Sequence, residues 1–121
     1  MESVAGVRVH LLPIEPDDIT AGHWRNPAIA ARLDASDAII FGLPTLMGSV
    51  AAVYKSFLEW AFAPWRQRRR KDKVAAGFTN SAAQSGDKLN TLFDLAMFAA
   101  QMGMIWVGGR SAGQQLVGRF A

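Results

Sequence analysis

The sequence predicts a single α/β domain with a mostly parallel sheet and helices on both of its faces. Short apolar runs alternate along the chain with segments of helical periodicity, an order typical of repeated βαβ units. Three of these runs end in loops rich in Gly, Ser, Thr or Asn. The chain has 121 residues, of which 50% are hydrophobic and 19% charged, so we expect one modest core. In this interpretation residues 1–121 form one domain, and 113–121 is a loose tail of weak periodicity.

The N-terminal third predicts an edge strand and a short helix. Residues Val7–Leu12 alternate apolar and polar side chains before becoming apolar, which suits a strand with one covered face, and Pro13 stops it. A helix is predicted over Pro27–Leu33. Asn26 is a favourable N-cap for it, and proline fits the first helical position.

The central stretch predicts a buried strand, a tight turn and a long amphipathic helix. The apolar run Ala38–Gly42 reads as the strand, and the turn is the Gly- and Pro-containing loop Gly42–Ser49. Apolar side chains then recur with helical spacing up to Pro64, which we expect to end the helix. These positions are Val50, Val53, Tyr54, Phe57, Leu58 and Ala61.

The second half predicts two more strands around one long helix. The small-residue run Val74–Thr79 suits a strand that is closely covered by helices, and the polar loop 80–86 follows it. Asp87 is then a plausible N-cap for a helix over Lys88–Met102. The last strand is predicted over Met104–Val107, ending at a pair of glycines.

Composition excludes several kinds of function. The absence of cysteine rules out disulfides, thiol catalysis and thiolate metal sites. The two histidines, His10 and His23, are far apart in sequence and lack the carboxylate spacing of a metal site, so we expect no metal. No apolar run approaches the roughly 20 residues that span a bilayer, and no signal peptide is recognised, so we expect a cytoplasmic protein.

Three loops are expected to meet at the same edge of the sheet: Gly42–Ser49, Thr79–Gly86 and Gly108–Gly113. They offer backbone N–H groups, hydroxyls and amides, which suit an uncharged planar ligand with polar edges. They contain no Ser-His or paired-carboxylate arrangement, so no catalytic side chain is predicted and chemistry would come from a bound cofactor. Ordinary turns have the same composition, and composition alone does not decide between the two interpretations.

Several motifs in order resemble one known family. They are Asp37-Ala-Ile-Ile-Phe-Gly-Leu-Pro-Thr-Leu-Met-Gly-Ser-Val50, Phe57-Leu-Glu-Trp60, Trp65, Lys71-Asp-Lys73, Ala76-Gly-Phe-Thr-Asn-Ser81, Ser85-Gly-Asp-Lys-Leu-Asn-Thr91 and Met102-Gly-Met-Ile-Trp-Val-Gly108. Together they resemble the flavodoxin-like NAD(P)H-dependent FMN reductase and quinone reductase family, close to the tryptophan-repressor-binding-protein (WrbA) type. The resemblance spans roughly Val7 to Gly113 and implies a flavodoxin-like, three-layer α/β/α fold.

The resemblance implies an FMN cofactor, hydride transfer from NAD(P)H, and a quinone or free flavin as acceptor. By position, it assigns one side of the flavin to Pro44, Thr45, Leu46, Met47 and Gly48. The other side falls to Thr79, Asn80, Ser81, Ala82, Ser85 and Gly86. Trp65 matches an aromatic that helps to wall the nicotinamide or quinone pocket in the family. Leu46, Met47 and Met102 depart from the residues that many members have at those positions.

The family's first strand and its phosphate-binding loop have no counterpart in this sequence, so the implied fold is truncated at its N-terminus. Residues Met1–Gly6 fall where the first helix of the family would be ending. The missing strand would lie between Val7–Leu12 and Ala38–Gly42. Without it, the backbone N–H and C=O groups along one edge of each of these two strands lack hydrogen-bond partners. We therefore expect a homo-oligomer, a dimer or tetramer that could exchange strands, and weak or absent FMN binding to the isolated chain.

A basic run follows the central helix and contributes most of the net charge of +3. Its cations are Arg66, Arg68, Arg69, Arg70, Lys71 and Lys73. Nucleic acid, acidic lipid and the phosphates of NADPH are candidate partners, but a solvated connection is the interpretation we favour. Two functions remain open: an FMN-dependent NAD(P)H reductase of quinones or flavin, and a non-catalytic flavodoxin-like oligomerising module.

Overall fold

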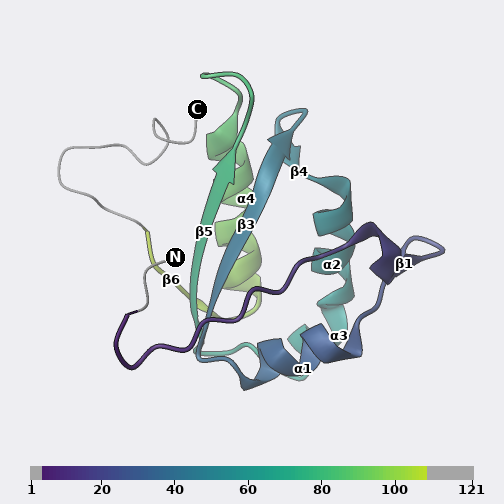
Figure 1. Cartoon of the computed structure of the whole chain (residues 1–121), viewed down its shortest axis with the longest axis vertical. Helices are drawn as coiled ribbons and strands as arrows, with labels where there is room; N and C mark the ends of the chain where they lie inside the picture. The colour runs from purple at the N-terminus through teal and green to yellow at the C-terminus, as the bar shows by residue number, and fades with distance from the viewer. Residues whose placement is uncertain (1–3, 109–121) are drawn as a thin grey trace.

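A four-stranded sheet in the order β4-β3-β5-β6 lies at the centre of the structure, a computed structural model that describes residues 4–108 (Figure 1). The strands β3 (Ala38–Leu46), β5 (Val74–Asn80) and β6 (Ile105–Trp106) are parallel. The short β4 (Ser49–Val50) pairs antiparallel with the end of β3. The α/β class and the mostly parallel sheet predicted from the sequence are confirmed.

Four α-helices and one small hairpin complete the described part of the chain. The helices are α1 (Pro27–Ala35), α2 (Ala52–Trp60), α3 (Phe62–Arg66) and α4 (Lys88–Gln101). Before α1, a 3-10 helix, η1 (Pro16–Asp18), leads into a two-stranded hairpin of β1 (Ile19–Thr20) and β2 (His23–Trp24).

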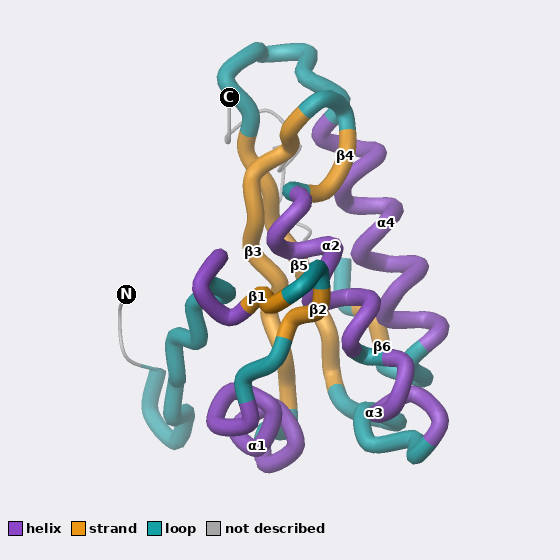
Figure 2. Tube along the Cα trace, turned by 90° about the vertical axis from the view of Figure 1, so that its right-hand side faces the viewer, coloured by secondary structure: helices purple, strands orange, loops and turns teal. Residues whose placement is uncertain are grey.

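The helices α2 and α4 cover the same face of the sheet. Side chains of β3 alternate strictly, and Ile39, Phe41 and Leu43 are buried on this face. The Phe41 ring meets Tyr54 of α2 and Phe98 of α4 edge to face, at centroid distances of 6.5 and 5.7 Å. Figure 2 shows α4 running along one side of the sheet. The residues that reach the core from both helices are those at the predicted helical spacing.

The opposite face of the sheet carries no helix within residues 4–108. Ile40 is 70% exposed there, although an interior position of a parallel strand is normally buried on both sides. The Phe78 ring lies over Gly42 on this face, where a Cβ atom would meet it at 2.3 Å. We call this the open sheet face and define it by Ala38, Ile40, Gly42, Pro44, Leu46, Val74, Ala76, Phe78, Asn80, Ile105 and Val107.

An aromatic cluster fills the space between the small hairpin and α2. Trp24 of β2 is 1% exposed and meets the rings of Phe57 and Trp60 at centroid distances of 5.1 and 4.7 Å. Edge-to-face pairs of this kind stabilise a core beyond the area that they bury. Leu12, Ile14 and Ile19 also pack against the core, so the N-terminal segment is attached to the domain by side-chain packing and not by pairing with the four-stranded sheet.

The predicted strand over Val7–Leu12 is wrong. This segment runs extended without pairing to a strand, and Val7, Val9 and Leu11 are exposed. The physical reason is the missing neighbour: within the described residues, no strand pairs with the second edge of β3 over 38–44. A strand in isolation has no partner for its backbone groups, whereas an exposed extended segment bonds to water. Only Leu12, at its end, packs against the core.

One turn is tighter than the sequence predicted, and a second tight turn lies where no hairpin was predicted. The strand β3 continues through Pro44 to Leu46, and the predicted loop is a hairpin closed by Met47 and Gly48, both at positive φ (49° and 79°). The residues Ala21 and Gly22 close the β1–β2 hairpin in the same way, with φ of 50° and 80°. Two successive left-handed residues match the twist of a hairpin, although Asn-Gly or Asp-Gly is the usual sequence there.

Most predicted helix boundaries are close to those observed. In α1, the Asn26 Oδ1 atom accepts a hydrogen bond from the Ile29 N–H at 3.1 Å, which confirms the predicted N-cap. Asp87 occupies the N-cap position of α4, but it is left-handed (φ 54°) and its side chain makes no capping bond. Pro64 does not end α2, which stops at Trp60; the proline lies inside α3.

Burial of Tyr54 predicts a specific alkaline instability. Burial raises the pKa of this phenol above its ordinary value of 10.0, and Tyr54 is the one tyrosine of the chain. Because the folded state favours the neutral phenol, its contribution is complete below pH 10 and is lost as the pH rises further. The expected loss is about 1.4 kcal/mol of unfolding free energy per pH unit.

Denaturant unfolding at several alkaline pH values measures this slope, with Tyr54→Phe as the control that lacks it. Ultraviolet absorbance of the phenolate should rise together with unfolding. Phenolate absorbance that rises near pH 10 while the chain stays folded would contradict the prediction.

Candidate functional site

The β3–β4 hairpin and the loop after β5 lie side by side at the carboxyl end of the sheet (Figure 1). The register places Leu43 opposite Thr79 and Pro44 opposite Asn80. We call residues 44–49 and 79–88 the loop rim. In open α/β sheets this edge is where ligands bind, so the rim is the candidate site.

Three buried threonines join the rim to α4. The Thr45 hydroxyl lies 2.8 Å from the hydroxyls of both Thr79 and Thr91, which ties β3, β5 and α4 together at one point. Thr91 is completely buried. Buried hydroxyls that satisfy one another hold their strands in a fixed relation, because each would cost free energy if left without a partner.

Two further bonds hold the hairpin turn onto α4. The Asn90 side-chain amide donates to the Gly48 carbonyl at 2.7 Å, and the Ser49 hydroxyl donates to the Asp94 carboxylate at 2.8 Å. Asp87 also lies beside the turn, since a Cβ atom on Gly48 would be 3.5 Å from its Oδ2 atom. The backbone of the turn is thus fixed from one side and exposed on the other.

Lys88 organises the second loop of the rim. Its side chain is 3% exposed, and its ammonium donates to the Ser81 hydroxyl (3.0 Å) and to the carbonyls of Ala83 (2.9 Å) and Gln84 (3.0 Å). A buried lysine needs such partners, and here all three ammonium protons are used. Gly86 closes the loop tightly, because a Cβ atom there would lie 2.5 Å from the Ser81 hydroxyl.

The structure brings together the rim residues that the sequence predicted. Leu46 and Met47 expose apolar surface at the hairpin, and Asn80, Ala82 and Ser85 are exposed on the facing loop. The remaining predicted positions lie within or beneath the same rim: Pro44, Thr45, Gly48, Thr79, Ser81 and Gly86.

One residue predicted for the site lies elsewhere in the structure, and one predicted loop is not tested by the described residues. Trp65 lies on α3, beyond the amino end of β5 and at the opposite end of the sheet from the rim (Figure 1). The place of the third predicted loop, Gly108–Gly113, stays a prediction, because residues 109–113 lie outside the described range.

The rim matches the ring of a flavin better than its phosphate. Exposed apolar side chains, backbone groups and hydroxyls suit an uncharged planar ring system with polar edges. Within the loop rim the only cation is Lys88, and its ammonium is fully engaged with the loop. No cation of the rim is therefore available for a phosphate, whose usual partners are Arg, Lys or a helix N-terminus. The α4 N-terminus lies at the rim, but the Asp87 carboxylate at its N-cap position disfavours an anion there.

Sequence reasoning missed the residues that support the rim from below. Lys88, Asn90, Thr91 and Asp94 lie on the first two turns of α4, where polar residues resemble an ordinary solvated surface. Their spacing offered one signal. Lys88, Thr91 and Leu95 are spaced so that they fall on one face of the helix. Because Leu95 is buried, the two polar side chains on the same face are expected to point inward as well.

Within residues 4–108, no group of His, Cys, Asp or Glu side chains could hold a metal ion. No helix in this part of the chain is long and apolar enough to cross a membrane.

The chain is similar to a flavodoxin and to several NAD(P)H dehydrogenases (quinone). It is 45% identical over 75 residues to flavodoxin FldP of Pseudomonas aeruginosa, an alignment that covers 62% of this chain and 41% of that protein. It is 35% identical over 99 residues to an NAD(P)H dehydrogenase (quinone) of Azorhizobium caulinodans, covering 77% and 50% of the two proteins. The chain thus spans about half the length of the curated relatives that it matches.

The fold comparison agrees with the sequence comparison. The crystal structure of a WrbA-like flavodoxin from Agrobacterium tumefaciens matches with a TM-score of 0.65 and 47% identity, covering 74% of this chain and 57% of that one. A model of the NADPH-dependent FMN reductase family matches residues 10–115, which is most of the chain. The fold is therefore flavodoxin-like, and the chain belongs to the NADPH-dependent FMN reductase family.

Proposed function

We propose that this chain provides the flavin-ring side of an FMN-dependent NAD(P)H oxidoreductase that acts on quinones or free flavin. The observation that carries the proposal is the loop rim. It combines exposed apolar side chains with backbone groups that are held in place. The hydrogen bonds from Thr45 to Thr79 and Thr91 hold the strands, and the Lys88 ammonium holds the loop. It has no Ser-His or paired-carboxylate arrangement, so the bound flavin would supply the redox chemistry and the protein would bind and orient it.

The comparisons support this reaction class. Relatives from Azorhizobium caulinodans and Acidovorax ebreus carry the name NAD(P)H dehydrogenase (quinone), and the matching family model is that of an NADPH-dependent FMN reductase. A cytoplasmic location is part of the proposal, because NAD(P)H is available there. The residues proposed to contact the ring are Pro44, Thr45, Leu46, Met47, Gly48, Thr79, Asn80, Ser81, Ala82, Ser85 and Gly86.

Titration with FMN and with riboflavin tests the proposal. Because the rim offers a ring site and no free cation, we expect weak binding of both, with affinities that agree within about threefold. Flavin fluorescence and absorbance measure the two affinities. Met47→Asp, which places a charge beside the ring, should weaken both, while Ala31→Asp on α1 should change neither.

If neither flavin binds at millimolar concentration, the proposed function is wrong. If FMN binds far more tightly than riboflavin, the chain contains a phosphate site outside the loop rim.

A second candidate function is a non-catalytic module that assembles copies of this chain. The open sheet face favours it, because it combines exposed apolar side chains such as Ile40 with a complete lack of charged residues. Parallel strands are normally covered on both faces, so a partner surface is expected there. We propose a homo-oligomer, a dimer or tetramer, in which a second copy covers this face.

A further inference from the structure

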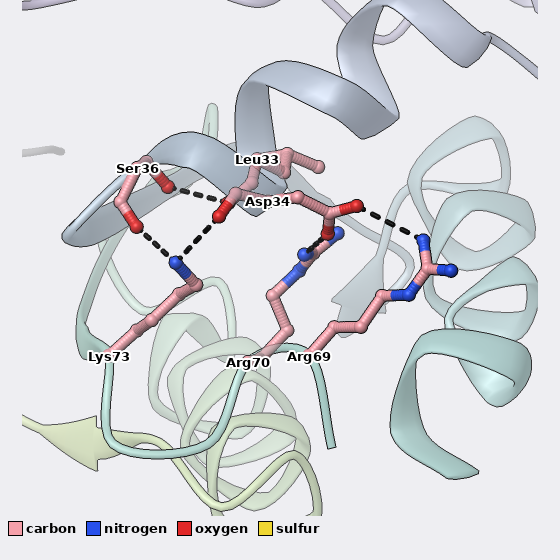
Figure 3. Close-up of polar contacts among 6 residues, drawn as sticks. All are labelled: Leu33, Asp34, Ser36, Arg69, Arg70 and Lys73. Carbon is pink, nitrogen blue, oxygen red and sulfur yellow. Dashed lines mark hydrogen bonds and ion pairs between the residues drawn. The ribbon is translucent and has the colours of Figure 1, made fainter. Parts of the chain in front are cut away.

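The basic run between α3 and β5 divides into structural cations and free ones. The Asp34 carboxylate accepts from Arg69 (3.1 Å) and Arg70, and the Lys73 ammonium donates to the carbonyls of Asp34 (3.0 Å) and Ser36 (Figure 3). These three cations bind the end of α1 to the loop before β5. A cation at a helix carboxyl end satisfies carbonyls that have no partner within the helix.

The two remaining arginines of the run have no such role. Within the described residues, neither Arg66 nor Arg68 forms an ion pair or a side-chain hydrogen bond. Arg68 also has a positive φ of 53°, a conformation that costs free energy in a residue other than glycine. Two unpaired guanidinium groups in one short segment leave charge available for an anion.

Both arginines line an open groove of about 470 Å³. The groove lies between residues 65–71, at the end of α3 and just after it, and residues 101–103, at the end of α4. Its lining includes three cations, one aromatic ring and one amide: Arg66, Arg68, Lys71, Trp65 and Gln101. Lys71 is also within 3.0 Å of the Asp72 carboxylate, and both side chains are exposed.

The aromatic wall of this groove is accessible. Trp65 is 46% exposed, and its ring lies 5.5 Å from the Phe62 ring at an interplanar angle of 34°. An exposed tryptophan beside free arginines offers a stacking surface and phosphate donors within one site. If the basic run were only a solvated surface, an exposed tryptophan beside it would have no role. If the ligand were only apolar, the two arginines would have no role.

We propose that this groove binds a nucleotide, with the base stacked on Trp65 and the phosphates held by Arg66 and Arg68. The groove is lined by residues that precede the amino end of β5. The loop rim follows the carboxyl end of that strand, at the other end of the sheet from α3 (Figure 1). It is therefore a site separate from the proposed flavin site. The ligand could be a free nucleotide or one unit of a single-stranded nucleic acid, and the same chemistry recognises both.

Calorimetric titration with ATP, tripolyphosphate and adenosine tests the proposal. ATP should bind at least about fivefold more tightly than tripolyphosphate, because base stacking adds to the phosphate contacts. Arg66→Gln and Arg68→Gln should each weaken ATP binding about tenfold, while Arg25→Gln, an equal loss of charge elsewhere, should leave it within twofold. Trp65→Leu should remove the advantage of ATP and leave tripolyphosphate binding unchanged. Circular dichroism confirms that each variant is folded.

Two further titrations identify the source and the place of the ligand. A short oligothymidylate that binds much more tightly than ATP, through the same three residues, would assign the groove to single-stranded nucleic acid. Weaker binding than ATP would assign it to free nucleotides. Saturating riboflavin should not displace ATP. Equal binding of ATP and tripolyphosphate, an equal effect of Arg25→Gln, or displacement by riboflavin would each overturn the proposal, and none of these results depends on flavin reductase activity.

Discussion

Replacement of Lys88 with methionine is expected to weaken flavin binding at least tenfold and to release the loop over residues 81–86. The ammonium of Lys88 makes three hydrogen bonds, all to this loop. Bonds from a charged donor contribute roughly 1.5–3 kcal/mol each, so the loop loses most of what holds it in one conformation. The expected effect on binding follows because a loop that must be reordered by the ligand lowers the affinity.

The same substitution should change global stability much less than it changes the loop. Methionine has a similar length and needs no desolvated charge, so the loss of the bonds is partly offset by the removal of a buried ammonium. Amide hydrogen exchange of the flavin-free protein separates the two effects. Exchange should accelerate over 81–86 and stay unchanged in β3. Lys55→Met, at an exposed lysine of α2, is the matched control. Unchanged exchange over 81–86 in Lys88→Met would show that other contacts hold the loop.

The secondary structure was largely predictable because the buried face of the sheet and the helices obey simple periodicities. Ala38–Gly42 and Val74–Thr79 are apolar runs too short for helices, and both are strands. The Asn26-Pro27 pair satisfies the first turn of α1 by itself, which is why that boundary was visible in the sequence. Local rules succeed where the stabilising contact is local.

The errors arise where a contact is distant in sequence. Val7–Leu12 has the pattern of a strand, but strand formation requires a neighbouring edge, and the pattern cannot show whether one exists. Lys88 and Thr91 have polar side chains on a helix, and only the packing of α4 against β3 and β5 places them inside. The positions of the rim loops were predictable from the order of the elements, whereas the residues that hold them were not.

The second large effect is expected on the open sheet face. Wild-type protein should be at least a dimer at micromolar concentration, and Ile40→Lys should shift it to monomer. The Ile40 side chain is 70% exposed in one chain, and its burial by a second copy would contribute about 1.5–3 kcal/mol. In a twofold symmetric dimer each substitution occurs twice, and an unpaired ammonium in an apolar contact adds a further penalty. The dissociation constant should therefore rise by more than about a hundredfold.

Light scattering coupled to size exclusion measures this shift, and a second variant decides which surface is involved. The outer side of α4 also exposes apolar side chains, at Leu89, Phe93 and Met97, and could form a contact of its own. Met97→Lys introduces the same charge there and should leave the oligomer intact if the sheet face is the interface. Dissociation by Met97→Lys alone would move the interface to α4.

A wild-type chain that is monomeric at micromolar concentration would mean that no second copy covers the sheet. The apolar positions on β3, β5 and β6 would then require a different partner surface, because exposed parallel strands of this kind are otherwise covered in folded proteins.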